Sequence, residues 1–307
     1  MAKPNGKIYI TGASGRLGRS VLEHLNAIPL VRKKSGLKNE IVTDFSADSL
    51  KKILNDASVI VHVAGSVDTL DKKKLWEVNV ELTKRIVEAT PKNCKIIFAS
   101  SIAVYGKKLA EIPANEKTMT TPDSEYAKTK LTAEKLVSSL QNYVILRIGT
   151  LYGPQFEDYN KILARLEKGK MRLIGDGSNR IPFVHVDDVA VLFERAIERG
   201  SGVYVVAGVP LTQKKVYEVA AKELGVAHST KRIGRRSALL LASLGELGYH
   251  FGKRPSLTKE HVGVLAYDRS FDCSKAKKEL GFVPRSLEKG IKEMVLNYKR
   301  TFRSHTI

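Results

Sequence analysis

The sequence is poor in cysteine, and it has no long run of apolar residues. Its 307 residues include only Cys94 and Cys273, too few for a disulfide framework, so a reducing compartment is expected. The first residues lack the apolar stretch of a signal peptide, which predicts a cytoplasmic protein. The most apolar window, 238–247, contains Ser243, Gly245 and Glu246 and is much shorter than the roughly 20 residues that cross a bilayer. A transmembrane protein is therefore not expected.

Acidic residues are scarce relative to basic ones. Aspartate and glutamate number 32 against 52 lysines and arginines, which gives a formal net charge of +20. Such a charge attracts anions, so phosphate-bearing ligands, a nucleic acid or anionic lipid, or simply a basic host proteome would each explain it. The lysines are spread along helical segments and form no basic tail, which favours a solvated basic surface and no nucleic-acid partner. Examples are Lys51, Lys52, Lys72, Lys73, Lys74, Lys214 and Lys215.

The first 150 residues alternate short apolar runs with amphipathic segments, a pattern typical of βαβ units. Between two of the runs, the segment 75–89 places apolar residues at helical spacing, so one stripe can cover a sheet. We therefore predict an α/β fold of the Rossmann type, a doubly wound parallel sheet over residues 1–155. The predicted strands are Lys7–Thr11, Ala27–Val31, Val59–Ala64, Lys95–Ser100 and Tyr143–Ile148.

The regular alternation weakens after residue 150, where clusters of glycine, asparagine and proline indicate turns. We expect a smaller C-terminal substrate lobe over residues 156–307, interleaved with the last core strands. Val189–Arg199 and Lys214–Leu224 are predicted as helices and Val203–Ala207 as a returning strand. Ser286 is predicted to cap a final helix that ends near residue 299.

A glycine-rich loop follows the first predicted strand and precedes a helix. Glycines 12, 15 and 18 are spaced three residues apart, which permits a tight turn, close approach to a pyrophosphate and close helix–sheet packing. The helix N-terminus adds an electrostatic preference for an anion. The loop therefore predicts a dinucleotide cofactor. The cofactor-binding residues predicted here are Gly12, Ser14, Gly15, Arg16, Leu17 and Gly18.

The end of the second predicted strand indicates which dinucleotide is bound. An acidic residue at this place binds the ribose 2′-hydroxyl of NAD, but the sequence here reads Leu-Val-Arg-Lys-Lys. Arg32, with Arg16 or Lys33, is suited to a 2′-phosphate instead. We therefore predict NADP in preference to NAD.

Tyr126 and Lys130 lie four residues apart in a segment that Asp123 or Ser124 can cap, so both belong to one face of a helix. An ammonium beside the phenol, together with the positive nicotinamide ring of the cofactor, is expected to lower the tyrosine pKa from about 10 and so prepare it for proton transfer. Ser101 ends the strand 95–100 at the ligand-binding edge of the sheet, while strand alternation turns Ser100 to the other face. Ser101, Tyr126 and Lys130 are thus the predicted catalytic residues.

Taken together, these segments resemble the extended short-chain dehydrogenase/reductase family, also called the NAD-dependent epimerase/dehydratase family. The resemblance implies that Ser101, Tyr126 and Lys130 are catalytic and that Lys130 also holds the nicotinamide ribose. It further implies that Asp44 and Phe45 flank the adenine and that Ala64, Gly65 and Asn79 support the cofactor. Ser66 and Arg180 are taken as substrate residues. The matching segments are 11–18, 44–45, 61–65, 79–80, 100–106, Tyr126 with Lys130, 146–147, 152–154 and 185–188.

The resemblance also indicates which of the family's reactions this chain is expected to catalyse. Family members that dehydrate hexoses carry Thr-Asp-Glu where this chain has Ser101-Ile102-Ala103, so dehydration is not expected. Arg180 is one position away from the place that an arginine takes in sugar-nucleotide enzymes of the family. The His185-Val-Asp-Asp segment has too few ligands for a zinc site, and no metal is predicted.

Three functions stay open at this point. The first is a sugar-nucleotide epimerase or ketoreductase, and the second is a 3β-hydroxysteroid or dihydroflavonol-like dehydrogenase. The third is a cofactor-binding regulatory protein. The apolar segment 235–250 has basic flanks, so it either packs in the lobe, covers an apolar substrate or rests on a membrane surface; packing in the lobe is favoured. The family resemblance also implies a homodimer through the helix 75–89 and the helix of Tyr126.

Overall fold

Seven parallel strands form the central sheet in the order β11-β6-β5-β4-β1-β2-β3. The computed structural model describes residues 6–228, 231–251, 255 and 257–302. The predicted doubly wound parallel sheet is confirmed. The five predicted strands of the first 150 residues and the predicted returning strand are all present within two residues of their expected bounds. β3 was not predicted, because two residues are too few for a recognisable pattern. The strands are β1 (Lys7–Thr11), β2 (Ile28–Val31), β3 (Ile41–Val42), β4 (Ala57–His62), β5 (Lys95–Ser101), β6 (Tyr143–Ile148) and β11 (Gly202–Val206).

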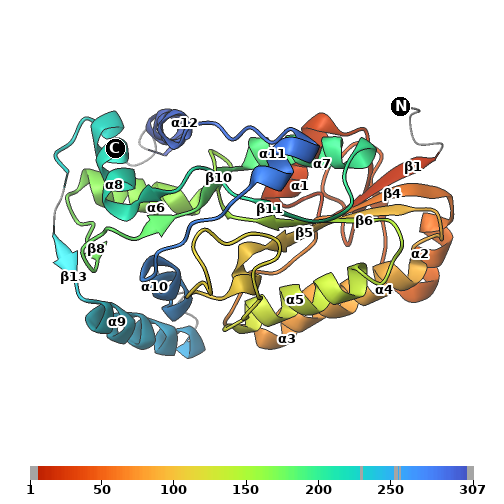
Figure 1. The fold of residues 1–307 in the computed structure, drawn as a ribbon, viewed down its shortest axis with the longest axis horizontal. Helices are drawn as coiled ribbons and strands as arrows, with labels where there is room; N and C mark the ends of the chain where they lie inside the picture. The colour runs from red at the N-terminus through yellow and green to blue at the C-terminus, as the bar shows by residue number, and fades with distance from the viewer. Residues whose placement is uncertain (1–5, 229–230, 252–254, 256, 303–307) are drawn as a thin grey trace.

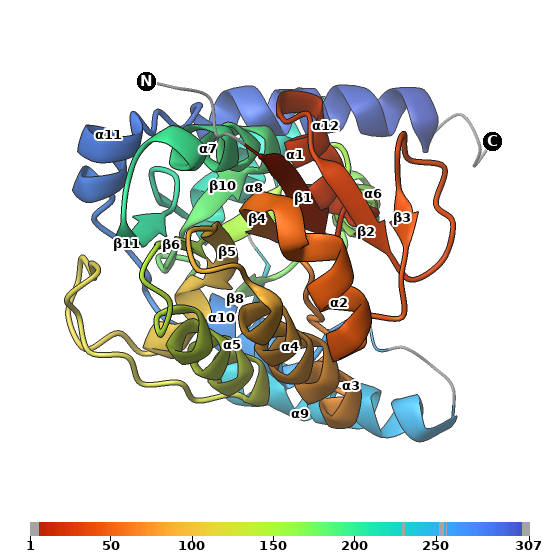
Figure 2. The same cartoon turned by 90° about the vertical axis from the view of Figure 1, so that its right-hand side faces the viewer.

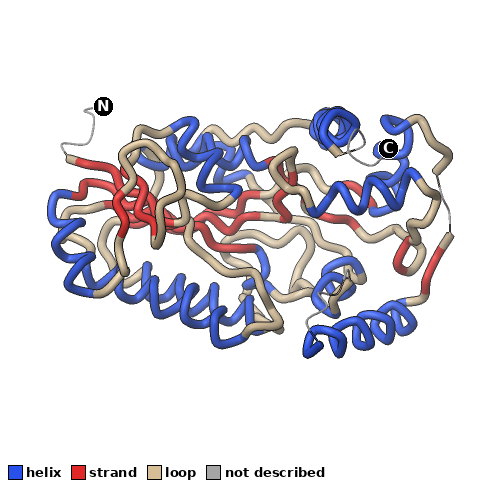
Figure 3. Tube along the Cα trace, turned by 180° about the vertical axis from the view of Figure 1, so that it is seen from behind, coloured by secondary structure: helices blue, strands red, loops and turns tan. Residues whose placement is uncertain are grey.

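Helices cover both faces of this sheet, as Figures 1 and 3 show. One face packs on α1 (Arg16–His24), α7 (Val186–Glu198) and α11 (Ser274–Leu280). The other packs on α2 (Ala47–Ile53), α4 (Leu82–Ala89) and α5 (Glu125–Val137). Two separate apolar cores result, because the inward side chains of each strand alternate between the two faces.

The helix predicted over 75–89 is interrupted. It consists of α3 (Lys72–Trp76), a π-helical turn η2 (Glu77–Glu81) and α4. A π turn inserts one extra residue into an α-helix and shifts the side chains at that point, often at a functional site. Here the shift buries Asn79, which is 1% exposed.

A smaller lobe stands at one end of the sheet, at the left of Figure 1. Its core lies between α6 (Asp158–Glu167), α8 (Gln213–Leu224) and α12 (Leu287–Thr301). Two further helices, α9 (Arg235–Leu247) and α10 (Lys259–Leu265), form its lower part. Because β11 returns from this half of the chain to the edge of the central sheet, core and lobe are interleaved. The lobe ladders pair β7 (Thr150–Tyr152) with β10 (Phe183–His185), β9 (Arg180–Ile181) with β12 (Leu211–Thr212), and β8 (Leu173–Ile174) with β13 (Arg232–Ile233).

Single-turn helices and caps complete the chain. The 3₁₀ turns are η1 (Leu54–Asp56), η3 (Ile102–Tyr105) and η4 (Gly248–Phe251). Ser124 caps α5 by accepting a hydrogen bond from Ala127 N, and Ser286 caps α12 through Lys289 N, so both serine caps are confirmed. Among the helices of the described residues, none is long and apolar enough to cross a membrane.

Candidate active site

The glycine loop between β1 and α1 forms a cradle that only glycine allows. Gly12 has a φ of +73°, and a Cβ atom there would lie 2.5 Å from Ala64 N. A Cβ atom on Gly18 would lie 2.2 Å from Gly12 O. Gly15 occupies the N-cap of α1, where no side chain of the described residues accepts a capping hydrogen bond. The first amides of α1 are therefore available to an anion, as a pyrophosphate requires.

Other predicted residues of this loop differ in their roles. Ser14 is exposed at the turn, whereas Leu17 is buried in the core and acts through packing. Arg16 donates to Asp158 at 2.7 Å, and its guanidinium lies 5.0 Å from the ring centroid of Phe156. Arg16 is thus held towards α6 in the lobe.

The strand end that was predicted to select the cofactor is basic and open. Arg32 and Lys33 are exposed directly after β2. The next carboxylate in the chain, Glu40, accepts hydrogen bonds from the main-chain nitrogens of residues 35–37 and from Ser35 Oγ. These bonds hold the pKa of Glu40 below its usual value. They also keep the carboxylate bound to the turn formed by residues 35–37.

Asp44 and Phe45 follow β3, but only one of the two side chains is accessible. The Asp44 carboxylate is exposed and accepts from Ser46 N at 2.9 Å. Phe45 has a φ of +57°, and its ring is 4% exposed within the core beneath the sheet. The expectation that the Phe45 side chain flanks the adenine therefore does not hold, because core burial takes that ring away from the surface.

Ser101, Tyr126 and Lys130 come together at the carboxyl ends of β5 and β4. Ser101 is half-buried at the end of β5, and its side chain lies near the Tyr126 hydroxyl, whose pKa it lowers. Lys130 is 5% exposed and donates to the main-chain oxygen of Ala99 at 2.8 Å. Its ammonium also lies close to Gly65, where a Cβ atom would be 3.1 Å from Lys130 Nζ. The structure thus brings together the three residues that the sequence singled out.

The protonation states in this site are set mainly by burial. Burial raises the pKa of Tyr126; the Ser101 side chain opposes this, while the charge of Glu260 adds to it. Burial lowers the pKa of Lys130 to about 8, although the Glu134 carboxylate favours the charged form. Lys130 makes its hydrogen bond to Ala99. The predicted lowering of the Tyr126 pKa needs the positive nicotinamide ring as well as this ammonium, so it stays a prediction. With its pKa raised by burial, Tyr126 carries its proton at neutral pH and is poised as a donor.

A buried ionic network lies behind these residues and was not predicted. Glu134, four residues after Lys130 on α5, pairs with Arg147 of β6 at 2.8 Å. Ser100 donates to the same carboxylate, which confirms that it points away from Ser101. Arg147 also donates to the Tyr105 hydroxyl at 2.8 Å. The only signal in the sequence was the continued spacing of four residues along α5.

Asn79 connects the loop after β4 to α5, the helix that carries Tyr126 and Lys130. Its Oδ1 accepts from Ser66 N at 2.7 Å, and its Nδ2 donates to Ser66 O and to Thr129 Oγ1, both at 3.0 Å. Ser66 is itself partly exposed in this loop, as a substrate-side residue requires. The π turn places Asn79 in this position, which explains why helical periodicity alone did not reveal its contacts.

His62 extends this connection to the glycine loop. Its Nε2 and Nδ1 lie 2.8 Å from Thr83 Oγ1 and 2.7 Å from Thr11 Oγ1. Because the Thr83 hydroxyl donates to Asn79 O, Nε2 carries the proton and Nδ1 accepts from Thr11. Burial and the charge of Lys130 lower the pKa of His62 to about 3, so the ring is neutral.

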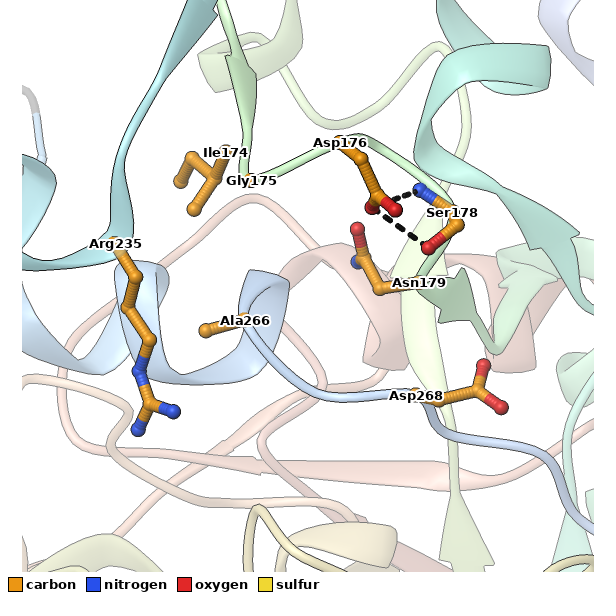
Figure 4. Close-up of a pocket in the computed structure, with 8 residues that line it drawn as sticks. All are labelled: Ile174, Gly175, Asp176, Ser178, Asn179, Arg235, Ala266 and Asp268. Carbon is orange, nitrogen blue, oxygen red and sulfur yellow. Dashed lines mark hydrogen bonds between the residues drawn. The ribbon is translucent and has the colours of Figure 1, made fainter.

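The predicted substrate residue Arg180 lies in the lobe and is already paired. Its guanidinium donates to both carboxylate oxygens of Asp268 at 2.6–3.1 Å, and its main-chain nitrogen donates to the same carboxylate. Asp268 also lines a cavity of about 300 Å³ beside this pair. The lining residues, drawn in Figure 4, are Ile174, Gly175, Asp176, Ser178, Asn179, Arg235, Ala266 and Asp268.

His185 has a structural position. It caps α7 by accepting from Asp187 N, and it packs edge-on against Tyr152. Burial and the charge of Arg285 lower its pKa. No group of histidine, cysteine and carboxylate side chains in the described ranges is arranged to hold a metal ion.

This arrangement has a counterpart among known proteins. Residues 8–207 match the model of the NAD dependent epimerase/dehydratase family. The chain belongs to this family. The glycine cradle, the seven-stranded sheet and the Ser101–Tyr126–Lys130 cluster all fall within the matched residues.

The chain covers different shares of two curated proteins that it resembles. The chain is 27% identical to 3beta-hydroxysteroid-dehydrogenase/decarboxylase isoform 2 of Arabidopsis thaliana, over 85% of the chain but only 52% of that protein. It is 22% identical to the 2-alkyl-3-oxoalkanoate reductase of Stenotrophomonas maltophilia, over 94% of the chain and 98% of the reductase.

Solved structures of similar fold include UDP-N-acetylglucosamine 4-epimerase from Bacillus cereus, with a TM-score of 0.73 and 23% identity over 96% of this chain and 99% of that one. RMD from Pseudomonas aeruginosa, complexed with NADPH, has a TM-score of 0.71 and 19% identity over the same shares of the two chains. These likenesses establish the fold.

Proposed function

We propose that the chain is an NAD(P)-dependent oxidoreductase that transfers hydride at a secondary alcohol or ketone. The observation that carries this proposal is the placement of the Ser101 side chain near the Tyr126 hydroxyl, beside the buried ammonium of Lys130. Two hydroxyls there can bind one substrate oxygen, and one of them holds a proton. A purely regulatory cofactor-binding protein would not require Ser101, Tyr126 and Lys130 to be arranged in this way.

The residues of the chain divide the work of a carbonyl reduction. The nicotinamide cofactor, when bound, supplies the hydride. Ser101 donates a hydrogen bond to the carbonyl oxygen, and Tyr126 transfers its proton to that oxygen as negative charge develops there. Lys130 and Asn79 hold the cofactor end of the site, and the cradle at Gly12 binds the pyrophosphate. Ketone, hydride and the Tyr126 proton together give the alcohol.

NADP is the proposed cofactor, in preference to NAD. Arg32 and Lys33 are exposed at the end of β2, and the nearest following carboxylate, Glu40, is committed to its own turn. A 2′-phosphate would therefore meet cations and no opposing charge. Among proteins of similar fold, RMD is complexed with NADPH, whereas WbmH of Bordetella bronchiseptica is complexed with NAD⁺.

The Arg180–Asp268 pair favours a substrate without a nucleotide diphosphate. In this state the Arg180 guanidinium is neutralised by Asp268, and the cavity beside the pair is lined by two carboxylates, Asp176 and Asp268, and one cation, Arg235. A diphosphate there would have to displace Asp268 from Arg180. Of the two enzyme classes that the sequence left open, the second, a 3β-hydroxysteroid or dihydroflavonol-like dehydrogenase, is therefore proposed. The names of the two curated relatives agree with this choice.

A substrate panel tests the proposal. Oxidation of NADPH would be followed at the nicotinamide absorbance with 3-oxo acids, 3-oxosteroids and nucleotide-linked keto sugars. We expect turnover with a free ketone and no thermal stabilisation by UDP or dTDP. Turnover of the nucleotide sugars alone would restore the epimerase or sugar-nucleotide reductase function. No turnover in either direction with any ketone or alcohol of the panel would contradict the proposed enzyme.

A further inference from the structure

Helix α9 buries its small residues and exposes its large apolar ones, the opposite of a usual surface helix. Its fully buried residues are the small Ala238 and Ala242, which pack against Ile174 and Val262. Four leucines on the opposite side are 56–62% exposed. Burying a leucine contributes about 1.5–3 kcal/mol, so a helix that packed only on its own lobe would turn its leucines inward. The exposed leucines are Leu240, Leu241, Leu244 and Leu247.

The basic residues of α9 lie at its N-terminal end. Arg235 and Arg236 stand in its first turn, which has no acidic residue, and Arg232 is exposed just before it. Arg235 is turned towards the lobe, where its guanidinium lies 4.3 Å from the ring centroid of Tyr267. Cations at a helix N-terminus oppose the helix dipole, so they do not stabilise α9 itself. The acidic residue of α9, Glu246, faces inward and pairs with Lys259 of α10 at 2.9 Å.

Arg236 lies on the leucine side, because positions 236, 240, 244 and 247 follow one another at helical spacing. Figures 1 and 2 both show α9 at the lower margin of the molecule, below the rest of the lobe. The leucines and Arg236 therefore form one outward surface. Together with Arg232, which is exposed just before the helix, we call it the α9 face: Arg232, Arg236, Leu240, Leu241, Leu244 and Leu247.

We propose that the α9 face lies on a bilayer surface that contains anionic lipid. Apolar side chains beside cations are the features of helices that lie in the membrane interface, with leucines among the acyl chains and arginines at the headgroups. Thirteen residues extend about 20 Å, less than the hydrocarbon thickness, so α9 rests on the bilayer and does not span it.

Charge complementarity favours this occupant over a second copy of the chain. Each copy has a net charge of +20, and its α9 face carries cations without an outward carboxylate among the described residues of α9. Two such faces would bring like charges together, whereas anionic headgroups pair with them. In the segments first expected to form a dimer, residues 75–89 and α5, the large apolar side chain that is exposed is Trp76, at 37% against 56–62% for these leucines.

Vesicle flotation tests the proposal. The 307-residue chain would be mixed with phosphatidylcholine vesicles with and without one third phosphatidylglycerol, and the floating fraction would be measured. We expect binding only to the anionic vesicles. The double substitution L240S/L244S should weaken binding more than tenfold, and R232Q/R236Q about tenfold or more, because each basic residue near the surface contributes about fivefold.

Matched controls separate the α9 face from general adsorption of a basic protein. V283S removes an apolar side chain that is even more exposed than the α9 leucines, and K51Q/K52Q removes two cations from α2 at the other end of the molecule. Both should bind like the parent chain, and thermal unfolding would verify that every variant is folded. Equal loss in K51Q/K52Q and R232Q/R236Q, or no effect of L240S/L244S, would overturn the proposal.

Sedimentation of the chain without lipid tests whether a second copy of the chain, and not a membrane, covers the α9 face. A dimer that L240S/L244S dissociates, together with no flotation of the parent chain, would assign the α9 face to a second copy. Failure of the parent chain to float, with turnover of a ketone intact, would remove the membrane proposal and leave the proposed function standing.

Discussion

Asn79 Nδ2 donates a 3.0 Å hydrogen bond to Thr129 Oγ1 and so joins the π turn of η2 to the catalytic helix α5. Thr129 donates in turn to the main-chain oxygen of Tyr126 at 2.8 Å. The other bonds of the Asn79 amide hold Ser66 at the end of the loop after β4. One buried side chain thus fixes both the first turn of α5 and the loop that faces it.

Substituting Asn79 should therefore loosen two elements at once. Asn79→Ala removes three buried hydrogen bonds and leaves Ser66 N and O without them, so we expect the free energy of unfolding to fall by about 2–4 kcal/mol. Urea unfolding measures this change. Asn93→Ala, at an exposed loop position, should change it by less than about 0.5 kcal/mol. Equal effects of the two substitutions would contradict the connecting role.

Tyr126→Phe should abolish most turnover while it leaves cofactor affinity nearly unchanged. Removing the hydroxyl takes away the proton donor, and such groups typically contribute 10²–10⁴-fold to the rate. Steady-state kinetics and a cofactor titration by fluorescence separate the two effects. Tyr143→Phe, which removes a hydroxyl at the start of β6, serves as the control. Turnover of Tyr126→Phe within tenfold of the parent enzyme would be incompatible with proton transfer by this residue.

His62 makes the fold sensitive to acid. Its pKa is about 3 in the folded chain because of burial, against 6.5 for an ordinary histidine. The unfolded chain therefore binds a proton that the folded chain excludes, and stability is lost as the pH falls from 6.5 towards 3.

Between pH 7 and pH 4.5 the loss due to His62 should reach about 2–3 kcal/mol. His62→Asn should remove this part of the pH dependence, measured as denaturant unfolding at several pH values. His24→Asn, at an exposed position in the last turn of α1, should leave the pH dependence as it is. Parallel pH curves for the parent chain and His62→Asn would refute the assignment.

The Glu134–Arg147 pair should be costly to break. Both side chains are under 10% exposed, and Glu134→Gln leaves the buried guanidinium of Arg147 without its counter-charge. We expect the free energy of unfolding to fall by about 3 kcal/mol or more. Glu125→Gln, which breaks the exposed pair with Lys128, should cost under about 1 kcal/mol. Thermal unfolding of both variants at equal pH makes the comparison.

Arg32 and Lys33 should set the preference between the two dinucleotides. Arg32→Ala/Lys33→Ala should raise the Kd of NADPH at least tenfold and leave that of NADH nearly constant, because only NADPH has the 2′-phosphate. Isothermal titration with both cofactors provides the measurement. A parent chain that binds NADH more tightly than NADPH would overturn this prediction.

The sequence alone predicted the features that depend on near neighbours. Apolar runs bounded by turns gave six of the seven sheet strands. Ser286 was identified as a cap and Ser124 as one of two candidates, because a cap acts on amides three residues away. Strand alternation likewise separated Ser101, which meets Tyr126, from Ser100, which meets Glu134.

Tertiary structure decided what distant segments do to one another. Arg180 and Asp268 are 88 residues apart, and no local pattern indicates that one neutralises the other. The ring of Phe45 enters the core, and the π turn brings Asn79 to Thr129 across 50 residues. The leucines of α9 point outward because alanines give the closer packing against the lobe. Periodicity reveals that a helix has two faces, but only the packed neighbours determine which face is covered.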